Sequence, residues 1–138
     1  TGPESKGYAL FKQHCASCHT EPLFTDHSFQ NNGLALDSLL RDVGRMKITQ
    51  KSTDSLKFKV PTLRNIERSA PYMHDGRYRS LQMVLFHYSA NIHASPTLAP
   101  QLRNGIPLTE DDKRNLVAFL KTLTDHTFLN NKQFHYPR

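Results

Sequence analysis

The sequence is poor in apolar residues, in cysteine and in long apolar runs. Hydrophobic residues make up 37% of the chain, and even with the six glycines added this falls short of the ~45–50% usual for a soluble globular protein. Either the core is small or another group fills it. No stretch approaches the ~20 apolar residues that cross a bilayer, so we expect no membrane span. Residues 1–5 lack the charged region and apolar core of a signal peptide, and we expect a mature or trimmed chain.

The length and charge of the chain narrow its class further. A length of 138 residues predicts one domain. The 18 Lys and Arg outnumber the 12 Asp and Glu and give a net charge of +6, which suits nucleic acid, an acidic ligand or an acidic partner protein. The basic residues are scattered singly, as at Arg64, Arg68, Arg77 and Arg79, without a basic block or nucleic-acid motif. Nucleic-acid binding is therefore not expected.

Hydrophobic periodicity predicts a mainly α-helical chain. Apolar positions three and four residues apart place one face of a helix over residues 5–18, ending near the two cysteines. A short helix is predicted over residues 34–43, before a glycine. Ser80 is a candidate N-cap for a helix over residues 81–88. The strongest helix begins at Thr109 and has three acidic residues in its first turn, where the helix dipole favours anions.

The remaining segments predict long loops around these helices. Turn-forming residues make 20–33 and 91–107 loops. Residues 56–60 alternate apolar and basic side chains, which predicts an extended segment and at most a small β ribbon. We place the domain at residues 1–124 and a polar C-terminal tail at 125–138.

One short motif carries chemistry. Residues 15–19 are Cys-Ala-Ser-Cys-His, which is C-x-x-C-H, the attachment motif of c-type haem. On a helical turn, the thiols of Cys15 and Cys18 each add to one vinyl group of the same porphyrin, and His19 follows as the proximal iron ligand. We therefore predict one covalently bound haem c, which also fills the small core.

Other uses of the motif are disfavoured by what surrounds it. A zinc site needs two more Cys or His ligands at typical spacing, yet the chain has no further cysteine and its other histidines are dispersed. A thioredoxin-like pair needs a βαβ context that the helical pattern does not supply. The haem propionates need cationic or backbone donors. Arg64 is our first candidate and Arg45 the second, against the alternative that each is a solvated surface charge.

Three further segments carry a family resemblance. Residues 58–66 are Phe-Lys-Val-Pro-Thr-Leu-Arg-Asn-Ile, residues 70–76 are Ala-Pro-Tyr-Met-His-Asp-Gly, and a predicted helix ends at His87-Tyr88. In this order they resemble the C-terminal haem domain of bacterial di-haem cytochrome c peroxidases, a superfamily that includes the di-haem enzyme of methylamine utilisation. The resemblance runs from about Gly7 to Leu123 and implies a cytochrome c-like fold.

The resemblance implies a function that this chain would share with a second domain. Those enzymes carry one c haem in each of two domains and reduce hydrogen peroxide with electrons from a small donor protein, and the C-terminal haem accepts and stores electrons. This chain has one C-x-x-C-H motif, so peroxide chemistry would need an N-terminal haem domain, and we expect no catalytic residue here. The alternatives are a stand-alone monohaem electron carrier and a regulatory or docking haem domain. Haem attachment outside the cytoplasm makes the periplasm the expected compartment.

The resemblance also offers candidates for the distal iron ligand. Tyr88 falls where the peroxidases have a ligating methionine, and a tyrosine there is similar to the methylamine-utilisation branch. Met73 lies downstream of His19 at a spacing that suits a His/Met monohaem cytochrome, and an open site is the third alternative. Met46 and Met83 are interpreted as core packing.

The 69–76 region leads to two further predictions, a tight turn and a calcium site. His74, Asp75 and Gly76 are interpreted as a tight turn in which Asp75 accepts backbone donors, in preference to an acid–base pair. The resemblance implies a calcium ion between the two domains, held in part by the backbone carbonyls of Ser69 and Pro71. Its side-chain partner would come from the other domain, so calcium is expected only at that interface.

Overall fold

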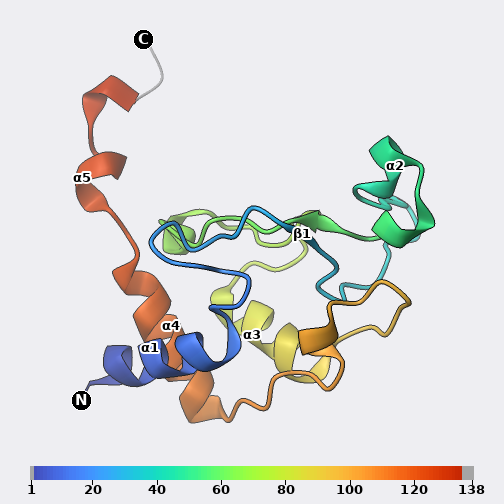
Figure 1. Cartoon of the computed structure of the whole chain (residues 1–138). Coiled ribbons are helices and arrows are strands. Elements are labelled where there is room, and N and C mark those ends of the chain that lie inside the picture. The colour runs from blue at the N-terminus through green and yellow to red at the C-terminus, as the bar shows by residue number, and fades with distance from the viewer. Residues whose placement is uncertain (1, 135–138) are drawn as a thin grey trace.

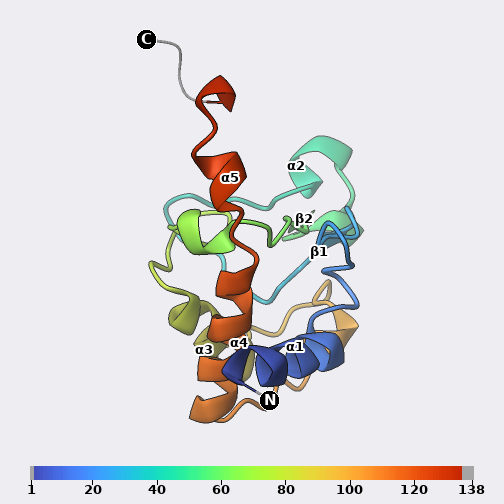
Figure 2. The same ribbon diagram turned by 90° about the vertical axis from the view of Figure 1, so that its left-hand side faces the viewer.

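Three helices form the base of the fold. The computed structural model describes residues 2–134, in which α1 spans Pro3–His14, α3 spans Leu81–Ala90 and α4 spans Glu110–Thr122. Helix α1 crosses α4 and α3 packs against α4 at one end of the molecule, while loops cover the other side (Figures 1 and 2). The expectation of a mainly α-helical, cytochrome c-like chain with long loops is confirmed.

The remaining elements are short. Strand β1 (Phe29–Gln30) pairs antiparallel with β2 (Phe58–Lys59), with Phe29 opposite Lys59. Helix α2 is the single turn Met46–Thr49, and α5 (His126–Leu129) leads away from the base (Figure 1). Four 3₁₀ turns complete the described residues, at Ser52–Asp54, Ile66–Arg68, Pro100–Leu102 and Lys132–Phe134. None of the helices in residues 2–134 has the length and hydrophobicity needed to cross a membrane.

Both predicted helix caps are present. The Ser80 hydroxyl accepts a hydrogen bond from the Met83 N–H at 3.3 Å at the start of α3. Thr109 and Asp112 form a reciprocal capping box at the start of α4, in which each side chain accepts from the other residue's backbone N–H, at 3.1 and 2.9 Å. These local bonds satisfy N–H groups that the first helical turn leaves without partners.

Two local expectations were wrong. Residues 34–43 form no helix: Asp37 instead accepts hydrogen bonds from the N–H groups of Leu39 and Leu40, at 2.8 and 2.9 Å, and closes a turn. Leu34 is buried, but Leu36, Leu39 and Leu40 are 47%, 91% and 61% exposed, so the segment has no continuous buried face to support a helix. Strand β1 lies inside the stretch expected to be loop, because it pairs with β2 across a sequence separation that local patterns do not record. The ribbon expected at residues 56–60 is present as β2. Residues 135–138 of the expected tail lie outside the described residues.

The crossing of α1 over α4 is the tightest contact of the fold. A Cβ atom added at Gly7 would lie 2.0 Å from the Asn115 carbonyl oxygen, so the two helix backbones touch there. Phe11, one turn later, is fully buried, and its ring centre lies 5.2 Å from that of Phe119. Glycine at position 7 therefore sets how closely α1 approaches α4.

We predict that Gly7→Ala destabilises the protein by about 1–3 kcal/mol, the usual cost of overpacking. The new methyl group has a backbone carbonyl in its way, so one helix has to move. Urea unfolding of the purified protein, followed by circular dichroism, measures the change. Gly2→Ala is the matched control, because its new Cβ would meet only the flexible end of the Glu4 side chain. Equal stability of Gly7→Ala and the control would contradict the close crossing.

Candidate functional site

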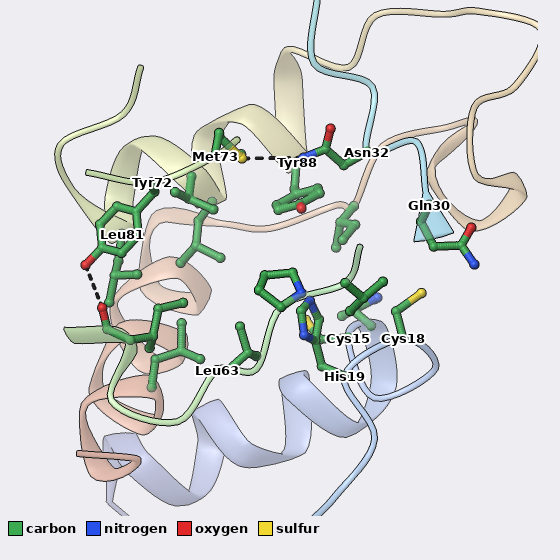
Figure 3. Close-up of a pocket in the computed structure, with 18 of the residues that line it drawn as sticks. Cys15, Cys18, His19, Gln30, Asn32, Leu63, Tyr72, Met73, Leu81 and Tyr88 are labelled. Carbon is green, nitrogen blue, oxygen red and sulfur yellow. Dashed lines mark hydrogen bonds between the residues drawn. The ribbon is translucent and has the colours of Figure 1, made fainter. Parts of the chain in front are cut away.

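A cavity of about 450 Å³ lies between the base helices and the loops (Figure 3). Its size falls in the range of about 300–1,000 Å³ usual for cofactor sites. Most of the wall is apolar and comes from both sides of the fold, with contributions from Phe11, Val60, Pro61, Leu63, Leu81, Leu85, Ile106, Leu108, Leu116 and Leu120. A flat hydrophobic cofactor would complete this core.

The end of α1 supplies one wall of the cavity. Cys15 caps the helix, and its carbonyl oxygen accepts hydrogen bonds from the N–H groups of Cys18 at 3.2 Å and His19 at 3.0 Å. This tight turn brings both thiols and the imidazole to the same cavity (Figure 3). The arrangement fits a group that is attached at two points and coordinated at a third.

Backbone hydrogen bonds with Phe24 and Pro61 orient the ring of His19. Its Nδ1 lies 3.0 Å from the carbonyl oxygen of Phe24. A carbonyl only accepts, so Nδ1 carries the proton and the lone pair is on Nε2. Burial lowers the pKa of His19, which favours the neutral form that binds a metal. Ligating histidines usually have such a second partner, which fixes the ring.

The two thiols are not activated in the manner of a redox pair. Burial raises the pKa of Cys15 to about 11, and the charge of Cys18 contributes to the rise. Burial also raises the pKa of Cys18, although the Ser17 hydroxyl opposes it. Redox-active C-x-x-C pairs have a lowered thiol pKa instead. This difference agrees with thioether attachment of a cofactor.

The opposite wall carries both candidate distal ligands. Tyr88 on α3 and Met73 in the 70–76 loop line the same cavity, and Asn32 lines it beside Tyr88 (Figure 3). The Asn32 amide donates a hydrogen bond to the Met73 sulfur at 3.4 Å. Burial raises the pKa of Tyr88 to about 12, although a hydrogen bond with the Asn32 side chain opposes this rise. The structure brings His19, Met73 and Tyr88 to one cavity.

Asn32 is a site residue that the sequence analysis missed. Residues 31–33 were interpreted only as chain breakers within a loop. Helix geometry predicts that His87 points away from Tyr88, and this was wrong: the two rings meet edge-on with centres 5.2 Å apart. His87 is fully buried, and its Nε2 lies 3.0 Å from the Asn32 carbonyl oxygen. Local patterns hold no signal for Asn32, because its partners come from α3 and the 70–76 loop.

The 70–76 loop is a tight turn, as its sequence indicates. The Asp75 carboxylate is buried and accepts hydrogen bonds from the Arg77 backbone N–H at 3.2 Å and from Arg77 Nε at 2.7 Å. Arg77 also donates to the Ala35 carbonyl oxygen at 2.9 Å. The His74 ring stacks on Phe58 with ring centres 3.7 Å apart, and both line the cavity. Aromatic stacking and the ion pair of Arg77 with the buried Asp75 carboxylate thus hold this wall.

The structure does not bring the two candidate arginines to the cavity. Arg64 is exposed and lines a separate surface depression beside His27 and Phe128. Arg45 pairs with Asp54 at 3.3 Å and lies over the Phe29 ring at 4.2 Å. Leu63 occupies the inward position next to Arg64, which leaves the arginine to solvent. Lys59 and Gln30 are polar residues that do line the cavity.

Ser69 and Pro71, the two positions tied to calcium by resemblance, also line the cavity. Within residues 2–134, no group of three or more His, Cys, Asp and Glu side chains converges on a metal-sized site.

Comparisons with known proteins agree with this geometry. A family model described as "Cytochrome c" matches residues 4–124. The chain is 40% identical over 122 residues to the methylamine utilization protein MauG of Methylorubrum extorquens, covering 86% of this chain and 33% of that protein. It is 36% identical over 124 residues to the cytochrome c551 peroxidase of Nitrosomonas europaea, covering 88% of this chain and 34% of that protein.

A solved structure extends the similarity to three dimensions. The crystal structure of a MauG-like protein associated with microbial copper homeostasis matches with a TM-score of 0.86 and 32% identity, over 99% of this chain and 48% of that one. The chain therefore spans about a third to a half of the length of the relatives it matches.

We predict that Asp75→Asn destabilises the protein at pH 7 by about 1.5–3 kcal/mol, the value of hydrogen bonds to a charged group. Burial of Asp75 opposes its ionisation, but Arg77 outweighs this effect and lowers the pKa below its ordinary value. The stabilisation is present above the unfolded pKa of about 3.9 and disappears as the pH falls through the lower folded value.

Urea unfolding of the wild-type protein and of Asp75→Asn between pH 7 and pH 3 measures the difference in their free energies of unfolding. We expect this difference to shrink below about pH 4. Asp111→Asn is the control, because Asp111 and its partner Arg114 are both largely exposed. A pH-independent difference would show that the lost interaction is not the ion pair.

Proposed function

The chain belongs to the cytochrome c family, and from this premise we propose that it is the electron-accepting c-type haem domain of a di-haem peroxidase. One observation carries the proposal: Cys15, Cys18, His19 and Tyr88 line a single apolar cavity. Relatives named as cytochrome c peroxidases and MauG support the assignment. In the whole enzyme, hydrogen peroxide would be reduced with electrons from a small donor protein.

Four residues of this chain would hold the haem, which supplies a one-electron redox centre. Cys15 and Cys18 would each form a thioether with the haem, and His19 would offer Nε2 to the iron, because the Phe24 carbonyl oxygen keeps the Nδ1 proton in place. Apolar side chains from α3, α4 and the loops exclude water from the faces of the ring.

Tyr88 is our proposal for the residue that would give the haem iron its second protein ligand. Its ring projects from α3 into the cavity (Figure 3). A phenolate is a hard, anionic ligand that stabilises ferric over ferrous iron, whereas a thioether raises the potential. Tyrosine ligation would make this site harder to reduce than a His/Met cytochrome. Met73 lines the same cavity, and this supports the alternative, a stand-alone monohaem electron carrier.

The proposed partner is an N-terminal haem domain. Four aliphatic side chains between positions 36 and 48 are exposed: Leu36 by 47%, Leu39 by 91%, Leu40 by 61% and Ile48 by 86%. Such groups of apolar side chains mark interaction surfaces. We assign them to the contact with that domain, where calcium would also belong. The periplasm is the proposed compartment, because haem attachment takes place outside the cytoplasm.

We predict that the protein made with haem-maturation machinery carries one haem through two thioether bonds. Denaturing mass spectrometry measures the apoprotein mass plus one haem. Cys15→Ala with Cys18→Ala removes the covalent attachment and serves as the control. A wild-type haem that is extracted by acidified organic solvent would overturn this assignment.

We predict that this chain accepts electrons but turns over peroxide negligibly. With His19 and Tyr88 both on the iron, no coordination position is left for peroxide. Steady-state oxidation of a reduced donor cytochrome measures turnover, and the Nitrosomonas europaea peroxidase is the positive control. Turnover close to that of the control, and lost in His19→Ala, would show an open distal position and refute the domain assignment.

A further inference from the structure

The orientation of the Asn32 side chain is fixed by its partners. Its Oδ1 accepts a hydrogen bond from the Leu34 N–H at 3.2 Å, and a backbone N–H only donates. The amide nitrogen must therefore point the other way, toward the Met73 sulfur 3.4 Å away. The side chain also hydrogen-bonds Tyr88. One oriented amide thus meets both candidate distal ligands.

The backbone that carries this amide is anchored on both sides. The buried His87 ring hydrogen-bonds the Asn32 carbonyl oxygen at 3.0 Å. Asn31, which is 1% exposed, donates to the hydroxyls of Ser95 at 2.9 Å and Thr97 at 2.8 Å. Asn32 is consequently held against the cavity by the core, and its donor is placed before any cofactor arrives.

The Met73 backbone is also held, whereas its side chain is flexible. The N–H of Tyr72, the residue before Met73, donates a hydrogen bond to the Tyr78 carbonyl oxygen at 2.7 Å. The Met73 carbonyl oxygen accepts a hydrogen bond from the Gly76 N–H at 3.3 Å. The methionine side chain has three rotatable bonds and a soft sulfur that suits haem iron. A specific contact is therefore needed to keep that sulfur from competing for the iron.

We propose that Asn32 selects the distal ligand by holding the Met73 sulfur in a hydrogen bond, which leaves the iron to Tyr88. Asn32 is a positioning residue in this scheme, since it acts through Met73. The inference rests on the proposed haem site with Tyr88 as ligand. It adds that the choice between a tyrosine-type and a methionine-type haem is made by a third residue.

The test compares ferric absorption spectra and reduction potentials of haem-loaded variants. In Asn32→Leu, the charge-transfer band typical of methionine sulfur on ferric haem appears and the potential rises. Both effects vanish in Asn32→Leu with Met73→Leu. Gln30→Leu is the matched control, because Gln30 lines the same cavity but its amide donates to Ser28 Oγ at 3.1 Å. If the leucine variant loses its haem, Asn32→Asp takes its place in the test. The aspartate keeps the oxygen that accepts from the Leu34 N–H and lacks the N–H that donates to Met73, so the same result is expected.

The outcomes separate this proposal from the ligand assignment on which it rests. An Asn32→Leu or Asn32→Asp protein with the wild-type spectrum and potential would overturn the role of Asn32. A wild-type spectrum that is altered by Met73→Leu and unchanged by Tyr88→Phe would show that methionine is already the ligand. That result would refute Tyr88 ligation and the selection by Asn32 together. Loss of the wild-type spectrum in Tyr88→Phe, together with an unchanged spectrum in Met73→Leu, supports Tyr88 as the iron ligand.

Discussion

The contact of α1 with α4 at Gly7 is the constraint on which the rest of the structure depends. Because the two backbones touch, the position of α1 is set to within the size of a methyl group. The helix ends at His14, and the next residues make the turn that carries Cys15, Cys18 and His19. The attachment chemistry is therefore positioned by a steric fit between helices, one turn of α1 beyond the fully buried Phe11.

The two faces of the cavity are built in different ways. The proximal face is local: thiols, imidazole and the Phe24 carbonyl that orients the imidazole lie within ten residues of one another. The distal face joins α3, the 70–76 loop and the segment around Asn32, which are distant in sequence. Long-range contacts leave the distal ligand open to change, and the ligand governs the redox potential.

This division suits a domain that works beside another. The residues that line the cavity, Cys15, Cys18 and His19 among them, all come from residues 2–134 of this chain. The exposed leucines before α2 and Ile48 within it present apolar surface on the outside. The chain matches a third to a half of the length of its relatives and carries one C-x-x-C-H motif, which is the pattern that the proposed haem module needs.

The sequence by itself determined the features that depend on neighbouring residues. These include the α3 and α4 caps, the mainly α-helical class, and the motif that brings Cys15, Cys18 and His19 to one turn. Only the tertiary structure decided features whose partners are remote in sequence. It showed the pairing of β1 with β2, the exposure that prevents a helix at 34–43, the outward position of Arg64, and the hydrogen bonds of Asn32 with Met73 and Tyr88. Periodicity and capping record local energies, whereas a cavity wall depends on side chains that meet only after the chain has folded.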